Sequence, residues 1–305
     1  MGRRSRGGAE GPHGVAVVDK PAGWTSHDVV ARSRGLLGTR KVGHAGTLDP
    51  DATGVLVLGV GKATRLLRYL SPLGKAYEAE IALGVETTTL DAAGEVTATH
   101  DMAGVTVDDA RRVAADHLTG DILQVPPMVS ALKVDGRRLH ELAREGIEVE
   151  REARPVTVHS FVIDEVPGRP DRLRARVECS SGTYVRTLAA DLGRLLGGGA
   201  HLARLRRTSV GPFTLADAVA LDDLDPDRLL PVSAAVRGLA AVTVDDEVAA
   251  LVAHGRVLDR SRLGVDGDGP WAVLGPDGTL LATYVAHRGD DVKPEVVTSG
   301  VRPQM

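Results

Sequence analysis

A glycine-rich loop around one carboxylate constrains this chain more than any other feature. Residues 43–54 read GHAGTLDPDATG, with glycine at both ends, and Pro50 fixes the backbone directly after Asp49. Glycines allow backbone conformations and a close ligand approach that side chains block. The loop therefore indicates that Asp49 is a catalytic carboxylate, although the same residues taken alone also fit a surface Asp-Pro turn.

Regular structure is predicted on both sides of this loop. Residues 14–19 read as a short apolar strand, and Ser26 is placed to cap a helix whose apolar residues recur over 29–37. The continuous apolar run at 55–60 is typical of a buried strand, and residues 62–70 have the pattern of a basic amphipathic helix. Asp49 is thus expected between structured elements.

The middle of the chain alternates between strand and helix patterns. Every second residue of 75–83 is apolar, so Tyr77 is expected to point inward. Residues 106–118 are predicted as a helix capped by the threonine at its start. Two alternating segments, 155–166 and 173–180, are expected to pair as a hairpin because a short loop with glycine and proline joins them.

Three further regions have a distinct character. Residues 124–154 mix both charge signs with two prolines and a short helical pattern at 139–143, which suggests an excursion from the core. The motif SGTYVR at 181–186 opens a helix whose start is placed to meet a ligand. Near the C-terminal end, short strand candidates such as 271–274 and 280–285 are separated by glycines, as in a small β-barrel-like module.

The composition is that of a conventional protein of two domains. The chain has 305 residues, which is longer than a single domain usually is. Of these residues 43% are hydrophobic, which is enough for a conventional core. Cys179 is the single cysteine, which excludes an intrachain disulfide and favours a reducing compartment. The arginines near the N-terminus precede no apolar run, and no segment reaches the roughly 18 apolar residues of a membrane span. We expect a soluble, cytoplasmic protein.

Charge is distributed unevenly, although the formal net charge is only −4. Residues 1–75 hold 12 Lys or Arg and 5 Asp or Glu, residues 169–207 hold 9 and 3, and residues 214–305 hold 8 and 15. The two basic segments form a phosphate-binding face if they meet in space, and otherwise are solvated surface. The sequence has no CxxC, HExxH, P-loop or GxGxxG motif, so we expect no metal and no nucleotide cofactor.

Four ordered segments resemble one known family. They are DKP at 19–21 followed by Gly23, the loop at 43–54, KAY at 75–77, and CSSGTYVRTL at 179–188. Together they resemble the bacterial tRNA pseudouridine synthases of the TruB family, and the similarity extends over roughly residues 13–215. Each segment alone is weak evidence, whereas the ordered set is highly specific.

The resemblance implies a fold and a division into domains. The fold is α+β: the pseudouridine synthase fold with a mixed, mainly antiparallel sheet flanked by helices, plus a small C-terminal β-barrel-like (PUA-like) domain. Residues 1–12 are expected to be a disordered basic tail and residues 13–238 the catalytic domain, with an insertion at about 124–152 that closes over RNA. Residues 239–305 are expected to form the PUA-like RNA-binding domain.

The resemblance also implies an activity. Members of the family isomerise uridine 55 in the T loop of tRNA by breaking the bond from N1 to C1′ and rejoining the uracil through C5. No atom is gained or lost, so no cofactor is expected. Asp49 matches the essential carboxylate of the family. Arg186 matches the arginine that pairs with this carboxylate, and it is expected to lower the pKa of Asp49. Tyr77 matches the tyrosine whose ring stacks on the base. Attack at C1′, attack at C6 and removal of a sugar proton all remain open for Asp49.

The same resemblance implies residues that bind the T stem-loop of tRNA, with the protein acting as a monomer. The target base must be flipped out of the RNA, and His44 would stack within the RNA loop. The other residues implied in substrate or RNA binding are Lys20, Asp91, Lys133, Arg144, Tyr184 and Leu205. The chain has Thr88 where the family often has an acid, which puts the role of this motif in question.

Three functions fit these features. The first is a tRNA uridine isomerase, the second a tRNA-binding chaperone that uses the same cleft without turnover, and the third a synthase of the archaeal or eukaryotic type that works with a guide RNA. The presence of Asp49, Tyr77 and Arg186 together disfavours the second. A closing segment within the chain itself, at 124–152, disfavours the third.

Overall fold

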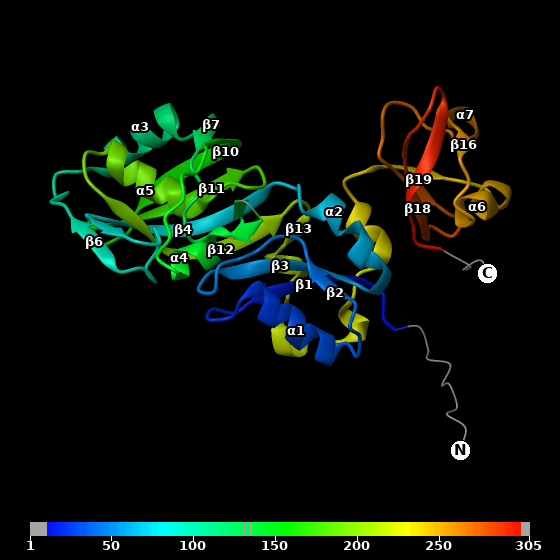
Figure 1. Ribbon diagram of the computed structural model, residues 1–305, viewed down its shortest axis with the longest axis horizontal. Helices are drawn as coiled ribbons and strands as arrows, with labels where there is room; N and C mark the ends of the chain where they lie inside the picture. Colours follow the sequence, from blue (N-terminus) through cyan, green and yellow to red (C-terminus); the bar gives the residue numbers. More distant parts are fainter. Residues whose placement is uncertain (1–10, 131, 135, 300–305) are drawn as a thin grey trace, which may run out of the picture.

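The computed structural model describes residues 11–130, 132–134 and 136–299 (Figure 1). Most of the expected tail at 1–12, and residues 300–305 of the expected C-terminal domain, therefore lie outside the described residues. The described chain forms two main sheets with helices packed on them, and Figure 1 shows the second sheet as a separate mass at one end of an elongated molecule. The predicted α+β class is confirmed.

The larger sheet has ten strands among the residues that the structure describes. Its main path runs in the order β14 (Val219–Ala220), β1 (Gly14–Lys20), β3 (Thr53–Val60), β12 (Ala200–Val210), β4 (Lys75–Leu83), β11 (Arg172–Cys179), β10 (Arg154–Glu165) and β7 (Gly120–Gln124), while β2 (Val42–His44) pairs with β3 and β13 (Phe213–Thr214) pairs with β12. The pairs β1–β14 and β3–β12 are parallel and the others antiparallel. The sheet is therefore mixed and mainly antiparallel, as expected.

Helices cover the larger sheet in two places. Figure 1 shows α3 (Val107–His117) and α5 (Val185–Leu195) over the half that contains β4, β11 and β10, and α1 (Ser26–Leu36) at the β1–β3 end. Apolar side chains of α3 and α5 join those of β4, β10 and β11 in one core, and those of α1 join β1 and β3 in another. The core on the α5 side places the start of this helix beside the strands that carry Tyr77 and Leu205.

Thr25, not Ser26, caps α1. The Thr25 hydroxyl accepts the backbone N–H of Asp28 at 3.1 Å, and the Asp28 carboxylate accepts that of Thr25 at 3.0 Å, which is a complete capping box. The predicted cap was wrong because Ser26 is buried and bonds elsewhere. Its hydroxyl accepts the N–H of Leu48 at 2.9 Å and donates to the Leu48 carbonyl at 3.2 Å, so the first residue of α1 holds the loop that precedes Asp49.

The predicted basic helix at 62–70 is shorter and tighter than expected. Gly61, with φ +60°, turns the chain out of β3, and residues Gly61–Leu66 form a 3₁₀ helix (η1) before a single α-helical turn, α2 (Leu67–Leu70). The Thr64 hydroxyl donates to the Gly61 carbonyl at 2.7 Å. This local bond competes with regular α-helical pairing, so the segment stays in short pieces.

Most of the other predicted elements are confirmed. The hairpin of β10 and β11 is antiparallel, Thr106 caps α3, and Tyr77 on β4 is buried. The charged segment after residue 124 contains β8 (Lys133–Val134), β9 (Arg137–Arg138) and α4 (Leu139–Arg144). Short elements elsewhere are β5 (Val85–Thr87), β6 (Val96–Thr99) and the 3₁₀ helices η2 (Leu215–Asp217), η3 (Leu221–Asp223), η4 (Pro226–Arg228) and η5 (Val232–Val236).

The second sheet forms the C-terminal module. Its strands lie in the order β15 (Ala240–Thr243), β17 (Trp271–Leu274), β18 (Leu280–Ala286), β19 (Asp291–Val297) and β16 (Leu258–Asp259), with α6 (Asp246–Ala253) and α7 (Arg260–Leu263) beside them. The sheet packs around its own core, which includes Trp271 and Tyr284. The strands predicted at 271–274 and 280–285 are confirmed.

The C-terminal module packs against α2. Arg68 forms an ion pair with Glu295 at 2.7 Å, Arg65 donates to the Val297 carbonyl at 2.9 Å, and the Tyr69 hydroxyl also bonds to Glu295. Ala272, Leu280 and Val296 of the module join the apolar cluster under η1, α2 and η5. The acidic module therefore docks on the basic segment that follows β3.

None of the described helices is both long and apolar enough to cross a bilayer.

Gly54, at the end of the Asp49 loop, lies where three strands pass close together. It pairs with Lys20 on β1 and with Arg207 on β12. Its φ is +102°, and a Cβ at this position would lie 2.1 Å from the backbone oxygen of Arg207. The sheet therefore requires glycine here, for both backbone conformation and space.

Gly54→Ala is expected to lower the free energy of unfolding by at least about 2 kcal/mol, because it adds both backbone strain and overlap. Chemical denaturation followed by circular dichroism measures the change. Gly35→Ala in α1 is the matched control, since nothing lies within 4 Å of the added Cβ, and it should stabilise by roughly 0.5–1 kcal/mol. Unchanged stability for Gly54→Ala would contradict the close packing of β1, β3 and β12.

Candidate active site

Asp49 lies in the loop between β2 and β3, and the buried Lys20 of β1 bonds to the backbone of this loop. The Lys20 ammonium, on a side chain with no exposed surface, donates to the carbonyls of Pro21 at 2.9 Å, Trp24 at 2.6 Å and Pro50 at 2.8 Å. Burial lowers the pKa of Lys20 to about 8. Lys20 was expected to bind substrate, but in this structure its three donors hold backbone and its side chain does not reach solvent.

Arg207 holds the other side of the same loop. Its side chain is almost fully buried, and its guanidinium donates to the carbonyls of Val55 at 2.7 Å, Thr47 at 3.2 Å and Gly46 at 3.2 Å. Burial lowers the pKa of Arg207 below its usual range. A role for Arg207 in the site was not expected, because nothing in the sequence indicates that its side chain turns inward from β12.

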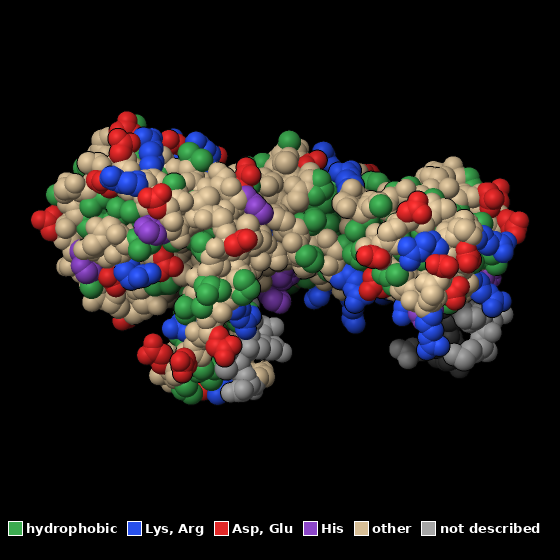
Figure 2. Space-filling view, turned by 90° about the horizontal axis from the view of Figure 1, so that it is seen from above, with side chains coloured by type: hydrophobic (Ala, Val, Ile, Leu, Met, Phe, Trp, Pro, Cys, Tyr) green, Lys and Arg blue, Asp and Glu red, His purple; other side chains and the backbone are tan. Residues whose placement is uncertain are grey.

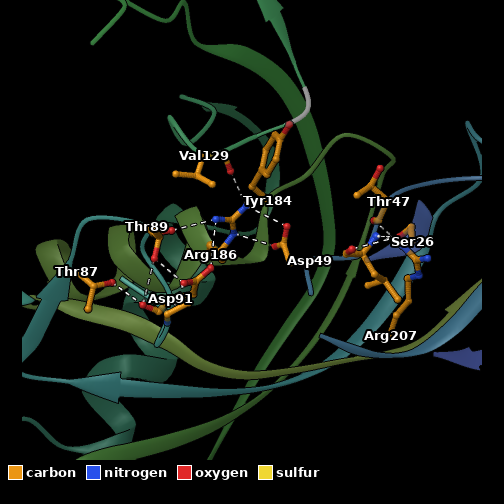
Figure 3. A network of polar contacts seen from close by, with 12 residues as sticks. Ser26, Thr47, Asp49, Thr87, Thr89, Asp91, Val129, Tyr184, Arg186 and Arg207 are labelled. Carbon is orange, nitrogen blue, oxygen red and sulfur yellow. Dashed lines mark hydrogen bonds and ion pairs between the residues drawn. The ribbon is translucent and has the colours of Figure 1, made fainter. Parts of the chain in front are cut away.

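Arg186, in the first turn of α5, binds two carboxylates at once (Figure 3). Its Nε lies 3.0 Å from Oδ2 of Asp49 and its Nη2 lies 3.3 Å from Oδ1, while Nη1 lies 3.2 Å from Oδ2 of Asp91. Nη1 also donates to the Thr89 carbonyl at 3.1 Å and Nη2 to the Val129 carbonyl at 2.9 Å. These five contacts match the five N–H donors of a guanidinium, whose orientation is therefore fixed.

The expected lowering of the pKa of Asp49 was wrong. Burial raises this pKa above the ordinary value of 3.8, and the neighbouring Asp91 carboxylate acts in the same direction. Arg186, Lys20 and Arg207 act in the opposite direction but do not reverse the shift. Burial is the largest effect on this pKa, and Arg186 offsets only part of it while also binding the second acid, Asp91.

Asp91 is held by the loop between β5 and β6. Its Oδ1 accepts the Thr89 hydroxyl at 2.5 Å and the N–H of Ala93 at 3.1 Å, which leaves Oδ2 for Arg186. Thr88, the departure from the family pattern, accepts the backbone N–H of Glu95 at 3.1 Å and so closes its own turn. The missing acid therefore leaves the contact between Asp91 and Arg186 intact.

Two cavities meet at Asp49. The smaller, of about 260 Å³, is lined by Tyr77, Tyr184, Leu205 and the 181–183 turn. The larger, of about 760 Å³, lies along β4, β12 and the Asp91 loop. Asp49, Arg186 and Leu205 line both cavities. A group bound in the smaller cavity would thus lie between two aromatic residues with the carboxylate at its edge.

Gln124 fixes the wall of the smaller cavity. Its side-chain oxygen accepts the backbone N–H of Tyr184 at 2.7 Å, and its side-chain nitrogen donates to the Tyr184 carbonyl at 3.2 Å. Burial raises the pKa of both Tyr184 and Tyr77, so both phenols are protonated at neutral pH. The sequence marked residue 124 as the start of a charged segment but gave no signal for this contact.

The remaining expected RNA-binding residues are His44, Arg144 and Lys133, on β2, α4 and β8. His44 ends β2 with its ring edge-on to that of His27, centroids 5.3 Å apart, and burial lowers the pKa of His44. Arg144 is exposed in the last turn of α4. Lys133 belongs to β8, but its side chain lies outside the described residues. No described contact brings Arg144 to Asp49.

The two basic segments meet in the larger sheet, because β12 lies between β3 and β4. Some of their arginines are buried or paired, and others are exposed. Arg207 is buried and Arg206 forms an ion pair with Asp19 at 2.7 Å, whereas Arg174 and Arg204 are exposed along the larger cavity. Figure 2 shows Lys and Arg side chains interspersed with acidic ones on the face it presents. Part of the expected positive face is thus internal.

No cluster of three or more His, Cys, Asp or Glu side chains placed to hold a metal ion occurs among the described residues.

Comparison with known proteins identifies the family of this chain. The N-terminal domain of the TruB family pseudouridylate synthases matches residues 34–185, and the C-terminal domain of tRNA pseudouridylate synthase B matches residues 186–232. Proteins named tRNA pseudouridine synthase B from Arthrobacter sp. (strain FB24) and Thermobifida fusca (strain YX) are 49% and 50% identical to the chain. These matches cover 93% and 94% of this chain and 96% and 99% of the relatives.

Solved structures agree with the sequence matches. A chain of the Cbf5-Nop10-Gar1 complex has a TM-score of 0.73 at 30% identity, covering 93% of this chain and 84% of its own. A chain of an H/ACA RNP bound to a substrate RNA containing 2′-deoxyuridine has a TM-score of 0.71 at 27% identity, covering 96% and 92%. The fold is that of the pseudouridine synthases, and the chain is a pseudouridine synthase, an isomerase. The chain belongs to the TruB family of pseudouridylate synthases.

Asp91→Asn is expected to lower the pKa of Asp49, because it removes a nearby negative charge and leaves Arg186 with one carboxylate to bind. NMR titration of ¹³C-labelled Asp carboxyl carbons measures this pKa, which should lie above 3.8 in the wild type. Asp108→Asn, on the exposed first turn of α3, controls for loss of a carboxylate elsewhere. A pKa for Asp49 that stays equal or rises in Asp91→Asn would contradict the shared-charge arrangement.

Proposed function

We propose that this enzyme converts uridine 55 in the T loop of tRNA to pseudouridine. The relatives named tRNA pseudouridine synthase B, at about half identity over nearly the full chain, support tRNA pseudouridylation. The observation that carries the proposal is the Asp49–Arg186 ion pair at the mouth of a cavity walled by two tyrosines. This cavity is near the lower end of the usual size of small-ligand sites, as a single flipped nucleoside requires.

In the proposed mechanism, the uridine leaves the RNA stack and its base enters the smaller cavity, where it stacks on Tyr77. Asp49, held by Arg186, acts on the nucleoside as an anion by one of three paths: attack at C1′, attack at C6 or removal of a sugar proton. The bond from N1 to C1′ breaks, the base turns, and C5 bonds to C1′. The proton on C5 then leaves, with the Tyr77 hydroxyl placed to assist, and N1 gains a proton.

The other site residues have two kinds of role in this proposal. Tyr184 and Leu205 form the wall of the smaller cavity. Lys20 positions the Asp49 loop and Asp91 positions Arg186, and neither touches the RNA. The residues proposed to contact RNA are His44, Lys133 and Arg144. The segment at about 124–152 would close over the RNA, since the Val129 carbonyl near its start already bonds to Arg186.

We further propose a division of labour between domains. Residues 13–238 would form the catalytic domain and residues 239–305 an RNA-binding module of the PUA type, with residues 1–12 as a basic tail. The site needs no second chain for any of its described contacts, which supports action as a monomer. A cytoplasmic location would suit both a tRNA substrate and a single, buried cysteine.

The alternatives are less well supported. A chaperone without turnover would not need Asp49 and Arg186 at 3.0 Å beside the smaller cavity. The resemblance to a chain of an RNP supports a guide-RNA enzyme, but the identity of 27–30% in those comparisons is well below the 49–50% with the tRNA pseudouridine synthases B. A stand-alone tRNA enzyme is therefore favoured.

Asp49→Asn is expected to abolish turnover while leaving RNA affinity within a few-fold of the wild type. A T-arm hairpin tritiated at C5 of its uridines measures turnover as tritium released to water, because C5 exchanges its hydrogen for a bond to C1′. Asp51→Asn, a change of the same charge two residues away, is the control and should retain release. Release by Asp49→Asn equal to that of the wild type would remove Asp49 from the mechanism.

The position of the modified uridine has its own control. A hairpin with cytidine at position 55 and tritiated uridine elsewhere should release no tritium. Release from this RNA at the rate of the unaltered hairpin would contradict selection of uridine 55.

RNA affinity is expected to fall steeply with salt, because exposed arginines line the larger cavity. Arg204→Gln should reduce the slope of log K against log salt by about 0.7–0.9, the value for one phosphate contact. Arg32→Gln is the control, because the Arg32 side chain on α1 already forms an ion pair with Asp222 on η3. A flat salt response of the wild type would contradict a phosphate-binding role for the basic segments.

A further inference from the structure

Lys75 is a cation on the wall of the smaller cavity that has no part in the arrangement described so far. The other two cations that line this cavity, Arg186 and Arg207, hold Asp49 and its loop. It begins β4, two residues before Tyr77, and it lines the smaller cavity together with Tyr77 and Asp49. Its side chain is half-buried. Lys75 therefore borders the space that a base would occupy.

The Lys75 ammonium has no anionic partner in the described structure. It donates to the carbonyls of Leu73 at 2.7 Å and Ser71 at 3.1 Å, and no described carboxylate forms an ion pair with it. An ammonium has three N–H donors, so one remains beyond these two bonds. A lysine on a cavity wall that has an unused N–H and no carboxylate partner is a candidate for contact with a negatively charged ligand.

The surroundings of Lys75 are electropositive. A Cβ built at Gly46 of the catalytic loop would lie 3.5 Å from Cε of Lys75 and 3.9 Å from Nη1 of Arg207, so both cations approach the loop at the same point. Burial and the Arg207 charge lower the pKa of Lys75 to about 8, with the Cys179 thiol acting weakly the other way. The one carboxylate among the described residues that line this cavity, Asp49, is bound by Arg186. A negative charge that appears on a bound ring during function would therefore be stabilised beside Lys75 and Arg207.

The proposed reaction supplies that charge on each of its three paths. Attack at C1′ or removal of a sugar proton breaks the bond from N1 to C1′ with its electron pair on the base, which leaves as a uracil anion. Attack at C6 places the charge on O4 as an enolate. The charge is lost again when C5 bonds to C1′. At this stage the Asp49 oxygen leaves C1′ or C6, or the proton that Asp49 removed returns to the sugar, according to the path. C5 then loses its proton and N1 gains one, so Asp49 is regenerated and no oxidant or reductant is needed.

We propose that Lys75 is a further catalytic residue, whose free ammonium N–H stabilises the negative charge that develops on the uracil ring. The proposal rests on the proposed function, because it requires a uridine in the smaller cavity. Stabilisation of a charge present only during reaction raises the rate of the chemical step without tightening RNA binding. A contact from Lys75 to an RNA phosphate would instead strengthen binding and its salt dependence.

Lys75→Met is expected to slow single-turnover tritium release from the T-arm hairpin by about 100-fold or more, with the Kd for RNA and its salt slope unchanged. Lys75→Arg, which keeps a positive charge, should recover part of the rate. Lys41→Met, at an exposed lysine before β2, controls for loss of a charge. A melting temperature and an RNA affinity equal to those of the wild type would show that each variant is folded.

A 5-fluorouridine at the target position provides a second test. Fluorine withdraws electrons and stabilises the detached base as an anion, so the enzyme needs less help from a cation. Disappearance of 5-fluorouridine, followed by nucleoside analysis under single turnover, should therefore show a smaller defect for Lys75→Met than the uridine substrate does. An equal defect on both substrates would overturn the proposal.

The outcomes separate this proposal from the proposed function. A wild type that releases no tritium from the hairpin contradicts the proposed function itself. A wild type that is active, with Lys75→Met releasing tritium at the same rate, overturns only the role of Lys75. Weaker binding and a salt slope lowered by about 0.7–0.9 in Lys75→Met, with the rate of bound RNA unchanged, would also overturn it, since these mark a phosphate contact.

Discussion

The guanidinium of Arg186, shared between two carboxylates, is the contact on which the rest of the site depends. It joins Asp49 from the β2–β3 loop, Asp91 from the β5–β6 loop and the Val129 carbonyl to the start of α5. Because all its donors are used, one side chain fixes several loops relative to each other. Without its charge, two acids would face each other in a partly buried space, an arrangement that disfavours ionisation of either.

Two more buried cations support this arrangement in a different way. Lys20 and Arg207 donate to backbone carbonyls of the Asp49 loop rather than to carboxylates, so they fix its shape without neutralising their own charge. Arg207, Lys75 and Arg186 line the smaller cavity with Asp49, so positive side chains outnumber the carboxylate in its wall. Such an interior offsets part of the cost of keeping Asp49 ionised, and it suits a nucleotide whose base becomes negatively charged during the proposed reaction.

The negative charge of the C-terminal residues also has a partner within the chain. Arg65 and Arg68, in the basic segment after β3, are engaged by Val297 and Glu295 of the second sheet. The sequence suggested that this basic segment was available to phosphates, but docking of the module occupies part of it. The exposed arginines along the larger cavity are therefore the better placed groups for contact with RNA.

The sequence by itself determined the strands that frame the Asp49 loop, the hairpin of β10 and β11 and the α+β class, and its ordered motifs marked Asp49, Tyr77 and Arg186 as candidate site residues. Alternation, glycine position and ordered motifs are local properties, so they can be read without coordinates. Only the tertiary structure decided that Lys20 is buried, that Arg207 and Gln124 serve the site, and that the pKa of Asp49 is raised. Burial, hydrogen-bond partners and shared charges depend on segments far apart in the chain, and no local pattern records which of them will meet.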